Sequence, residues 1–422
     1  MRASIPAVST LLLLLLLLVS CGQGEQATPA SAAAAAEAPP ASYEEQLRLA
    51  LEEAVPGDVI TIPAGTHHFT RSLTLHTSGV TLRGAGIDAS VLSFRDQLAG
   101  AEGLLVTGSD FTIEDLAIED TVGDALKVNG GSNIIIRRVR TEWTRGPHTD
   151  NGAYGIYPVQ TENTLIEASV AIGASDAGIY VGQSRNVIVR NNRAERNVAG
   201  IEVENTVGAD VYGNVARNNT GGILVFNMPD LPMAGHSTRV FDNEVVGNNT
   251  ANFGTPGSAV ADVPAGTGIL INSNDKVEVF GNRIGNNNTA NVIVSSLFSA
   301  EYTSGRDTAS SFDPYPEMIY LYDNQFEPGG SAPDREALDA LRRQAFGDSG
   351  SLPDIVWDGV VDPEKSAQTG LSPQQYALCI DNPGATFINV DAGNGYQNPS
   401  TDLAPHACQH AKLAAVDLAL GS

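Results

Sequence analysis

The chain has 422 residues, 42% of them hydrophobic, and a formal charge of −25 from 24 basic and 49 acidic residues. The acidic charge argues against a nucleic-acid partner, because proteins that bind nucleic acids present a basic surface. The hydrophobic content argues against general disorder. The 43 Gly residues favour numerous tight turns, and therefore a β-rich repeat fold over a helical one.

Residues 1–20 have the features of an export signal, with Arg2, an apolar run at residues 11–18 and a small-residue cleavage site. Residues 18–21, Leu-Val-Ser-Cys, resemble the lipobox of bacterial lipoproteins, in which Cys21 becomes the lipid-carrying N-terminus. An ordinary cleaved signal is the alternative. Gly22 follows Cys21, which for this class implies the outer membrane, with the protein on its periplasmic or cell-surface face. Residues 21–42 are then expected to form a flexible tether.

A repeated Gly-Ile pattern dominates the middle of the chain. It recurs at intervals of 22 or 23 residues, with a last interval of 46, which fits either two coils or one coil with a long insertion. A period of this size indicates a solenoid. Side chains alternate along a strand, so the Ile is predicted to face the core, and the Gly before it is expected to supply a bend with positive φ. The Ile positions are Ile156, Ile179, Ile201, Ile223 and Ile269.

Two series of polar residues recur in the same coils. Because stacked amide side chains can bond one another, we expect both series to mark corners between strands. The first series is Gln160, Gln183, Asn205, Asn227 and Ser273, and the second is Asn192, Asn214, Asn243, Asn282 and Asn324.

With this repeat, and with entry segments at residues 54–66 and 79–86, the sequence resembles the right-handed parallel β-helix proteins of the pectate-lyase-like superfamily. The resemblance implies an all-β fold, a right-handed single-stranded parallel β-helix over residues 43–330 with a capping helix at residues 43–54. Among the branches of the superfamily, the chain is most similar to the β-helix repeat lipoproteins often encoded beside a secreted c-type cytochrome. The resemblance therefore implies a protein partner of that kind.

The repeat register is expected to end after Gly330, so residues 331–422 are predicted to form a C-terminal cap that shields the last coil. Residues 333–346 are predicted to form a helix opened by Asp334. With Cys21 used for lipidation, Cys379 and Cys408 remain as an even pair in an oxidising compartment, and we expect them to form a disulfide.

The outward positions of the Gly-Ile strands predict a ligand surface. In polysaccharide-active β-helix proteins this strand face lines the substrate groove, so the resemblance implies a polysaccharide ligand. Solvated outward residues without a ligand are the alternative. A longer loop at residues 144–152 is expected to overhang this surface. Ligand contacts are predicted at Lys127, Asp150, Tyr180, Glu202, Glu204 and Phe226, and catalytic candidates are Arg145, His148, Tyr154 and Tyr157.

Two classes of function remain open. A binding module or scaffold would use Tyr157, Tyr180 and Phe226 as stacking surfaces for sugars and would need no general base. A polyuronate lyase or epimerase is the alternative, because residues 154–160 share three positions, Tyr154, Gly155 and Pro158, with a motif of the mannuronan C5-epimerases. A tyrosine base would require a nearby cation to lower its pKa.

Glycoside hydrolysis is a third and weaker interpretation. Glu202 and Glu204 lie two residues apart and could supply the two carboxyl groups, but exposed strand carboxylates are the simpler explanation. His406 and His410 have a spacing that suits a metal, yet Cys408 between them is assigned to the disulfide. We therefore predict no metal and no cofactor. Residues 127–217 are close to neutral, so a neutral glycan would meet no electrostatic barrier there.

Overall fold

The computed structural model describes residues 42–300, 308–310, 312–418 and 420, and residues Ser42–Ser422 form one compact unit. The predicted export signal, the lipid attachment at Cys21 and tether residues 21–41 lie outside the described residues. No helix among the described residues has both the length and the apolar character that crossing a membrane requires.

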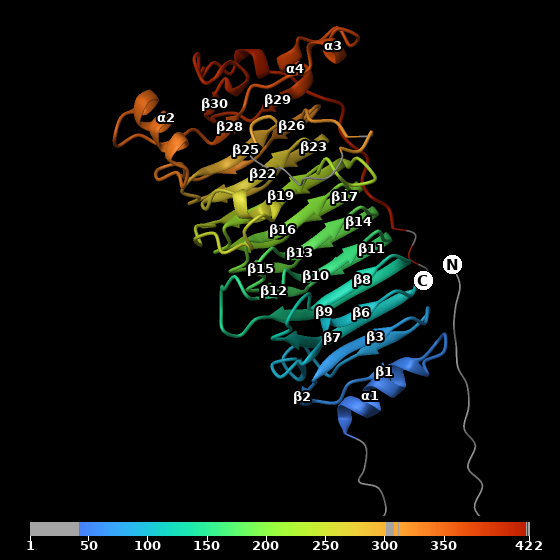
Figure 1. The fold of residues 1–422 in the computed structure, drawn as a ribbon. Helices are drawn as coiled ribbons and strands as arrows, with labels where there is room; N and C mark the ends of the chain where they lie inside the picture. The colour runs from blue at the N-terminus through green and yellow to red at the C-terminus, as the bar shows by residue number, and fades with distance from the viewer. Residues whose placement is uncertain (1–41, 301–307, 311, 419, 421–422) are drawn as a thin grey trace, which may run out of the picture. The chain divides into compact units, whose positions relative to one another are not determined.

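The described chain is a stack of parallel coils that begins at helix α1 (Tyr43–Glu52), as Figure 1 shows. One strand of each coil belongs to an eleven-stranded parallel sheet. Its strands, in order, are β3 (Arg71–Leu75), β6 (Ala99–Val106), β8 (Leu126–Asn129), β10 (Tyr154–Val159), β13 (Ala177–Gly182), β16 (Ala199–Glu204), β19 (Gly221–Phe226), β22 (Thr267–Asn272), β25 (Ala290–Ser295), β28 (Ile355–Trp357) and β30 (Phe387–Asn389).

The other strands of the coils form a nineteen-stranded sheet that wraps the rest of the core. Its strands are β1 (Val59–Thr61), β2 (Gly65–His68), β4 (Thr81–Arg83), β5 (Ser90–Ser93), β7 (Phe111–Glu119), β9 (Ser132–Glu142), β11 (Glu162–Glu167), β12 (Val170–Ile172), β14 (Arg185–Arg190), β15 (Arg193–Glu195), β17 (Val207–Tyr212), β18 (Val215–Arg217), β20 (His236–Phe241), β21 (Glu244–Val246), β23 (Asp275–Phe280), β24 (Arg283–Gly285), β26 (Ile319–Tyr322), β27 (Gln325–Phe326) and β29 (Leu378–Asp381).

The Gly-Ile repeat has the predicted register. Ile156 pairs with Ile179, and the same column continues through the next three coils. All five Ile side chains are fully buried in the core. Strand β19 pairs directly with β22, so the 46-residue interval is one coil with insertions. The predicted β-helix is therefore confirmed.

The Gly of the repeat has a different role from the one expected. Gly178, Gly200, Gly222 and Gly268 do not have positive φ. A Cβ at Gly178 would instead lie 2.5 Å from the Asn197 side-chain amide nitrogen. A Cβ at each of the other three glycines would lie 2.7–2.8 Å from the amide nitrogen of the Asn in its own coil, which is Asn219, Asn248 or Asn287. The expected bend is therefore wrong, and Gly is required because a second column of Asn side chains approaches the strand closely.

Buried Asn side chains form two ladders along the stack. In the predicted ladder, the backbone N–H of Asn192 donates to Asn214 Oδ1 at 2.9 Å, and this bond recurs at each coil up to Asn382. The second ladder, which we did not predict, has the same geometry. Its members are Asn197, Asn219, Asn248 and Asn287. The expected first series bonds less regularly, with one side-chain bond from Gln160 to Gln183 at 3.2 Å.

The coil register continues past Gly330, so the expected boundary between β-helix and cap is wrong. Strand β28 pairs with β25, β29 with β26, and β30 with β28. The repeat is hidden in the sequence because an excursion containing α2 (Glu336–Phe346) separates β27 from β28. The helix starts after Arg335, while Asp334 accepts a bond from Ala265 N–H.

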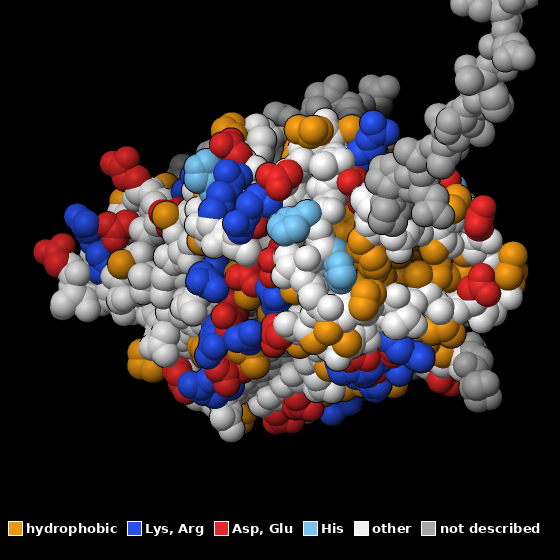
Figure 2. All heavy atoms as spheres, turned by 90° about the horizontal axis from the view of Figure 1, so that it is seen from below, with side chains coloured by type: hydrophobic (Ala, Val, Ile, Leu, Met, Phe, Trp, Pro, Cys, Tyr) orange, Lys and Arg blue, Asp and Glu red, His pale blue; other side chains and the backbone are white. Residues whose placement is uncertain are grey.

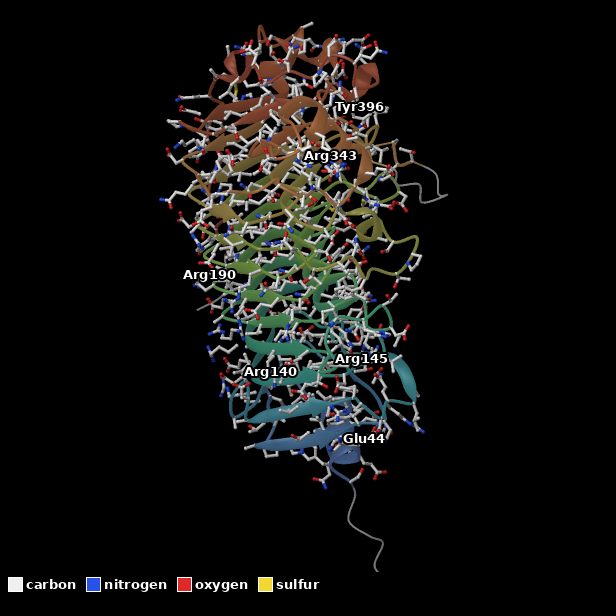
Figure 3. All side chains as sticks on the ribbon, turned by 90° about the vertical axis from the view of Figure 1, so that its left-hand side faces the viewer. Glu44, Arg140, Arg145, Arg190, Arg343 and Tyr396 are labelled. Carbon is white, nitrogen blue, oxygen red and sulfur yellow. A yellow bond between two sulfur atoms is a disulfide. The ribbon has the colours of Figure 1, made fainter. Side chains whose placement is uncertain are left out.

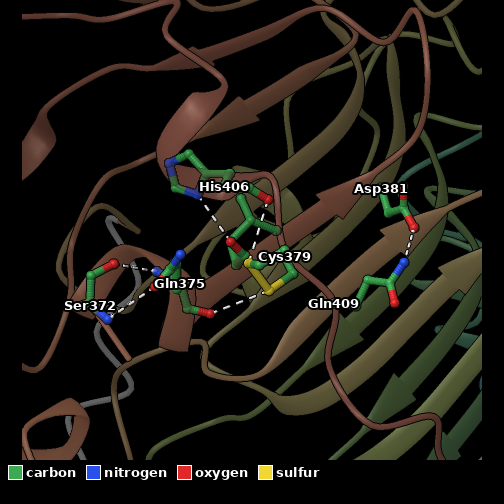
Figure 4. The surroundings of a disulfide bond; sticks show 8 residues. Ser372, Gln375, Cys379, Asp381, His406 and Gln409 are labelled. Carbon is green, nitrogen blue, oxygen red and sulfur yellow. Dashed lines mark hydrogen bonds between the residues drawn. A yellow bond between two sulfur atoms is a disulfide. The ribbon is translucent and has the colours of Figure 1, made fainter. Parts of the chain in front are cut away.

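The C-terminal segment covers the last coils. Short helices α3 (Pro363–Ser366), α4 (Pro373–Ala377), η2 (Ala392–Asn394) and η3 (Ala404–His406) lie in this region. A disulfide joins Cys379 of β29 to Cys408 (Figure 4). The buried His406 bonds to the Leu378 carbonyl at 3.0 Å through Nδ1. These contacts attach residues 406–408 to β29.

Candidate functional site

The outward face of the eleven-stranded sheet brings the predicted ligand residues into two adjacent columns. Lys127 of β8 pairs with Tyr157 of β10, and Tyr180 of β13 pairs with Glu202 of β16. In the second column, Glu204 lies between Gly182 and Phe226. The inward Ile and Val residues alternate with these positions, so burying the core places the columns outside it.

Three tyrosine rings pack against one another at this face. The ring centroids of Tyr154 and Tyr157 are 4.3 Å apart, and those of Tyr154 and Tyr180 are 4.7 Å apart. Lys127 Nζ lies 4.9 Å from the centroid of the Tyr157 ring. A Cβ at Gly182 would lie 2.1 Å from the Tyr180 hydroxyl. Glycine there lets Tyr180 lean across the strand and donate a 2.8 Å hydrogen bond to Glu204.

Three carboxyl groups lie beside these tyrosines: Asp176, directly before β13, and Glu202 and Glu204 of β16. Asp176 and Glu202 are 9% and 1% exposed, and Glu202 Oε2 has no hydrogen-bond partner. Across the described ranges, no Lys or Arg forms an ion pair with any of the three. Buried acids without a basic partner are costly to a fold, so this cluster calls for an explanation other than stability.

Burial raises the pKa of all three carboxyl groups. It raises the pKa of Asp176 to about 8, with a further contribution from the charge of Glu204. It raises the pKa of Glu204 to about 7, against the opposing effect of the hydrogen bond from Tyr180. The pKa of Glu202 is raised well above its usual range by burial and by the charges of its two acidic neighbours. All three groups therefore hold protons at pH values where surface carboxyls are ionised.

Two segments cover much of this face, residues 227–235 and residues 249–266, the second of which contains η1 (Ala259–Asp262). Met228, Val260 and Val263 pack in one apolar cluster with Tyr180 and Phe226. Tyr180 and Phe226 are consequently only 3% and 5% exposed. The interpretation of Glu202 as an exposed strand carboxylate is wrong for the same reason. Tyr154, Tyr157 and Glu204 stay partly exposed and mark the open end of the cluster.

The loop at residues 144–152 places its candidate residues differently. The His148 and Asp150 side chains are 52% and 77% exposed, with His148 Nδ1 3.5 Å from an Asp150 carboxylate oxygen. Arg145 (labelled in Figure 3) donates to Asn151 Oδ1 at 2.6 Å. Asn151 in turn bonds the Gly173 carbonyl and fixes the loop to the next coil. The polar contacts of these candidates stay within the loop, and their catalytic role stays a prediction.

The tyrosines are poor candidates for a general base. Burial raises the pKa of Tyr154 and Tyr157, and the neighbouring acids Asp176 and Asp124 raise it further. A phenolate base needs the opposite effect from a nearby cation. Lys127 is the closest cation identified, but its Nζ lies 3.5 Å from Asp124 and 3.7 Å from Glu102. Its charge is therefore shared with two carboxylates before it can act on a tyrosine.

One further acidic group has the composition of a cation site. One ligand oxygen from each of Asp275, Asp313 and Glu317 lies within 4.8 Å of the other two. The Lys365 ammonium bonds both Asp313 and Glu317, the latter at 3.0 Å. A side-chain cation thus already occupies the position that a metal ion would take.

Comparisons with known proteins agree with the architecture. Residues 78–235 match the family model described as the right handed beta helix region. The coils described above are accordingly those of a right-handed parallel β-helix. A search of curated proteins found no match.

Several solved structures are similar to this chain at low sequence identity. The A-module of a mannuronan C-5 epimerase from Azotobacter vinelandii has a TM-score of 0.48 and 16% identity, covering 81% of this chain and 91% of its own. Endopolygalacturonase I from Stereum purpureum has a TM-score of 0.42 and 11% identity, with coverages of 66% and 94%. An alginate lyase from a Paenibacillus species has a TM-score of 0.33 and 16% identity, with coverages of 67% and 93%.

Proposed function

We propose that this protein cleaves glycosidic bonds at the carboxyl cluster of Asp176, Glu202 and Glu204. The observation that carries the proposal is that these three acids lie outside the hydrophobic core, close together, and without a Lys or Arg partner among the described residues. Acids whose burial without a cation destabilises a fold are candidates for proton transfer. The resemblance of the sequence to polysaccharide-active β-helix proteins directs the choice of substrate to glycans.

The spacing of the two glutamates suits this reaction. Two residues apart on one strand face, their Cα atoms are separated by roughly 6.5–7 Å. Glycosidases hold their two carboxyl groups about 5–5.5 Å apart when they retain configuration and about 6.5–9.5 Å apart when they invert it. Side-chain rotation from this strand can reach either separation, so the stereochemical outcome is left to experiment.

The environments of the two glutamates assign their roles. Glu204 is partly exposed and accepts the Tyr180 hydrogen bond, which favours its ionised form. It is the proposed base or nucleophile. Glu202 is fully buried, and this burial is the main reason that its pKa is raised well above the usual range. It is the proposed acid that protonates the leaving oxygen. Because Met228 packs over this face, residues 227–235 must move aside when a sugar reaches Glu202.

The charge around the cluster favours a neutral glycan. Lyase and epimerase reactions need a group that neutralises the substrate carboxylate, yet Lys127 is already shared by Asp124 and Glu102. A uronate polymer would also meet the acidic cluster itself. The binding-module alternative has weaker support, because Tyr180 and Phe226 are covered and cannot offer ring faces to sugars. Export by residues 1–20, outer-membrane attachment at Cys21 and a c-type cytochrome partner remain proposals that rest on the sequence.

The test is a hydrolysis screen of the purified protein against neutral glycans and polyuronates. We expect new reducing ends on a neutral glycan, and their loss in Glu202→Gln. The control is Glu167→Gln, which changes an acid of β11 that is paired with Arg190. Ultraviolet absorbance from unsaturated uronates would instead indicate a lyase. Retention of a glycan without turnover, by wild type and variant alike, would support the binding module.

A further inference from the structure

An apolar pocket lies on the same sheet face, directly beyond the carboxyl cluster in the stacking direction. Its volume is about 620 Å³, within the range typical of small-molecule sites. Its floor is formed by the outward side chains of Leu270, Ile293 and Val356 on strands β22, β25 and β28. Phe226 closes one end of the pocket, and it pairs with Glu204 on the neighbouring strand.

Two side walls enclose the floor. Helix α2 contributes Leu338 and Leu341, which pack with Val356. The opposite wall comes from the segment around η1, through Ala259 and Val263. Figure 1 shows α2 standing beside β25 and β28. Figure 3 labels Arg343 of this helix, and Tyr396, which lines the pocket. The pocket is therefore a trough that follows the stacking direction.

Two charged groups of the pocket, Asp358 and Arg335, already have hydrogen-bond partners. Asp358 Oδ2 accepts hydrogen bonds of 2.6 Å from the Ser296 N–H, the Ser296 hydroxyl and the Ser299 hydroxyl. Arg335 donates to the Asp262 carbonyl at 2.7 Å. Among the lining residues, Asp262, Glu336 and Asp358 outnumber the single base Arg335. The acidic lining would therefore repel an anionic ligand, whereas an uncharged apolar chain would be repelled by no charge and would bury its surface against the apolar lining.

We propose that the apolar pocket binds the acyl or alkyl chain of a neutral glycoconjugate whose sugar lies at Glu202 and Glu204. This inference rests on the proposed function and names its substrate class. The floor from β19 to β28 spans three inter-strand steps, roughly 14 Å at about 4.8 Å each, which suits an extended chain more than a compact ring. The pairing of Phe226 with Glu204 places this end of the pocket one strand away from the carboxyl cluster.

The first test is calorimetric titration of the purified protein with n-hexyl, n-octyl and n-decyl glucoside, each below its micelle-forming concentration. We expect affinity to rise about fourfold for each added CH₂ group until the trough is filled. Octanoate is expected to bind more weakly than octyl glucoside because of the acidic lining. Equal affinities along the series, or octanoate binding as tightly as octyl glucoside, would overturn the proposal.

Variants locate the binding to the pocket. Ile293→Trp places an indole on the floor and is expected to remove the dependence on chain length. Ala337→Trp on the pocket side of α2 gives the same test without altering the sheet. Its matched control is Ala345→Trp on the same helix, since Ala345 does not line the pocket. If both pocket variants keep the wild-type rise in affinity, the chain binds elsewhere and the proposal fails.

The outcome for the pocket is separable from the outcome for the proposed function. A rise in affinity with chain length in a protein that hydrolyses no glycan of the screen would keep the pocket and overturn the proposed function. Hydrolysis of methyl glucoside with no effect of chain length would keep the proposed function and overturn this inference.

Discussion

The outward faces of the two sheets differ in one group of acidic residues, the carboxyl cluster of Asp176, Glu202 and Glu204. On the nineteen-stranded sheet, acids are paired with arginines of neighbouring coils, as in Arg190–Glu167 at 2.6 Å and Arg217–Glu195 at 2.6 Å. Figure 2 shows basic and acidic side chains interspersed at the end of the stack that carries α1. On the eleven-stranded sheet, Asp176, Glu202 and Glu204 lie among tyrosines and apolar side chains. The paired acids support the stack, whereas the unpaired acids cost stability and are therefore the ones that suggest chemistry.

The outward face of the eleven-stranded sheet around Asp176, Glu202 and Glu204 is the unpaired face, and that of the nineteen-stranded sheet is the paired face. The largest expected effect is on hydrolytic activity at the unpaired face. Glu202→Gln keeps the shape of the side chain but removes the transferable proton, so hydrolysis should fall by a factor on the order of 10²–10⁴. The measurement is the initial rate of reducing-end release on the glycan identified in the screen. Glu167→Gln at the paired face should keep the wild-type rate. Equal losses in the two variants would remove the contrast between the faces.

The next effect is on stability at the paired face. Arg239 of β20 pairs with Asp210, whose side chain is 4% exposed. Arg239→Met leaves that carboxylate buried without its cation, and should lower the free energy of unfolding by about 3 kcal/mol. Urea denaturation at pH 7 gives the value. A change below about 1 kcal/mol would show that Asp210 does not depend on its arginine.

At the outward face of the eleven-stranded sheet, replacing an acid is expected to raise the free energy of unfolding, the opposite of the effect of Arg239→Met. The pKa of Glu204 is about 7 in the folded protein and about 4.3 when unfolded. Between these values the folded state holds a proton that the unfolded state has lost, so stability falls as the pH rises from about 4 to about 7. Glu204→Gln removes this loss. The variant should match wild type near pH 4 and exceed it by roughly 1–3 kcal/mol at pH 8.

Urea denaturation of wild type and Glu204→Gln at the two pH values checks this sign. A variant that is less stable than wild type at pH 8 would mean that Glu204 is ionised and favourably bound in the folded state. The unpaired face would then resemble the paired one.

The smallest effect is expected at a more exposed ion pair. Arg190 bonds Glu167 but its side chain is 35% exposed. Because solvent screens such pairs, Arg190→Gln should lower stability by at most about 1 kcal/mol and leave hydrolysis unchanged. Thermal denaturation alongside the hydrolysis assay measures both. A larger loss than that of Arg239→Met would contradict the link between burial and the strength of the pair.

The coil repeat could be predicted because neighbouring coils impose the same requirement at each step. Ile179 must lie over Ile201 to bury both, and Asn214 must lie under Asn192 to accept its N–H. Because each coil must meet the same requirements, the same residue types recur at a regular spacing in the sequence. The coils beyond Gly330 follow the same rules, but the excursion through α2 interrupts the period, so sequence spacing alone could not detect them.

The candidate site was predicted only in part. The alternation of β16 put Glu202 and Glu204 on the outward face, but their burial depends on residues 227–235 and 249–266, whose packing no strand pattern encodes. Asp176 was missed. The only sequence signal for Asp176 is a difference between coils. Asp176 directly precedes its strand, whereas Val198 and Thr220 precede the equivalent strands of the next two coils. The environment that raises these pKa values arises from tertiary packing.

The central claim is that carboxyl groups on the eleven-stranded sheet hold protons near neutral pH. Nuclear magnetic resonance titration of protein labelled with ¹³C at glutamate side-chain carboxyls tests it most directly. We expect one resonance with a midpoint near pH 7, absent in Glu204→Gln, and a second with a midpoint well above that of an ordinary glutamate, absent in Glu202→Gln. If both variants lose only resonances that titrate below about pH 5, the carboxyls are ordinary surface acids and the proposed chemistry has no basis.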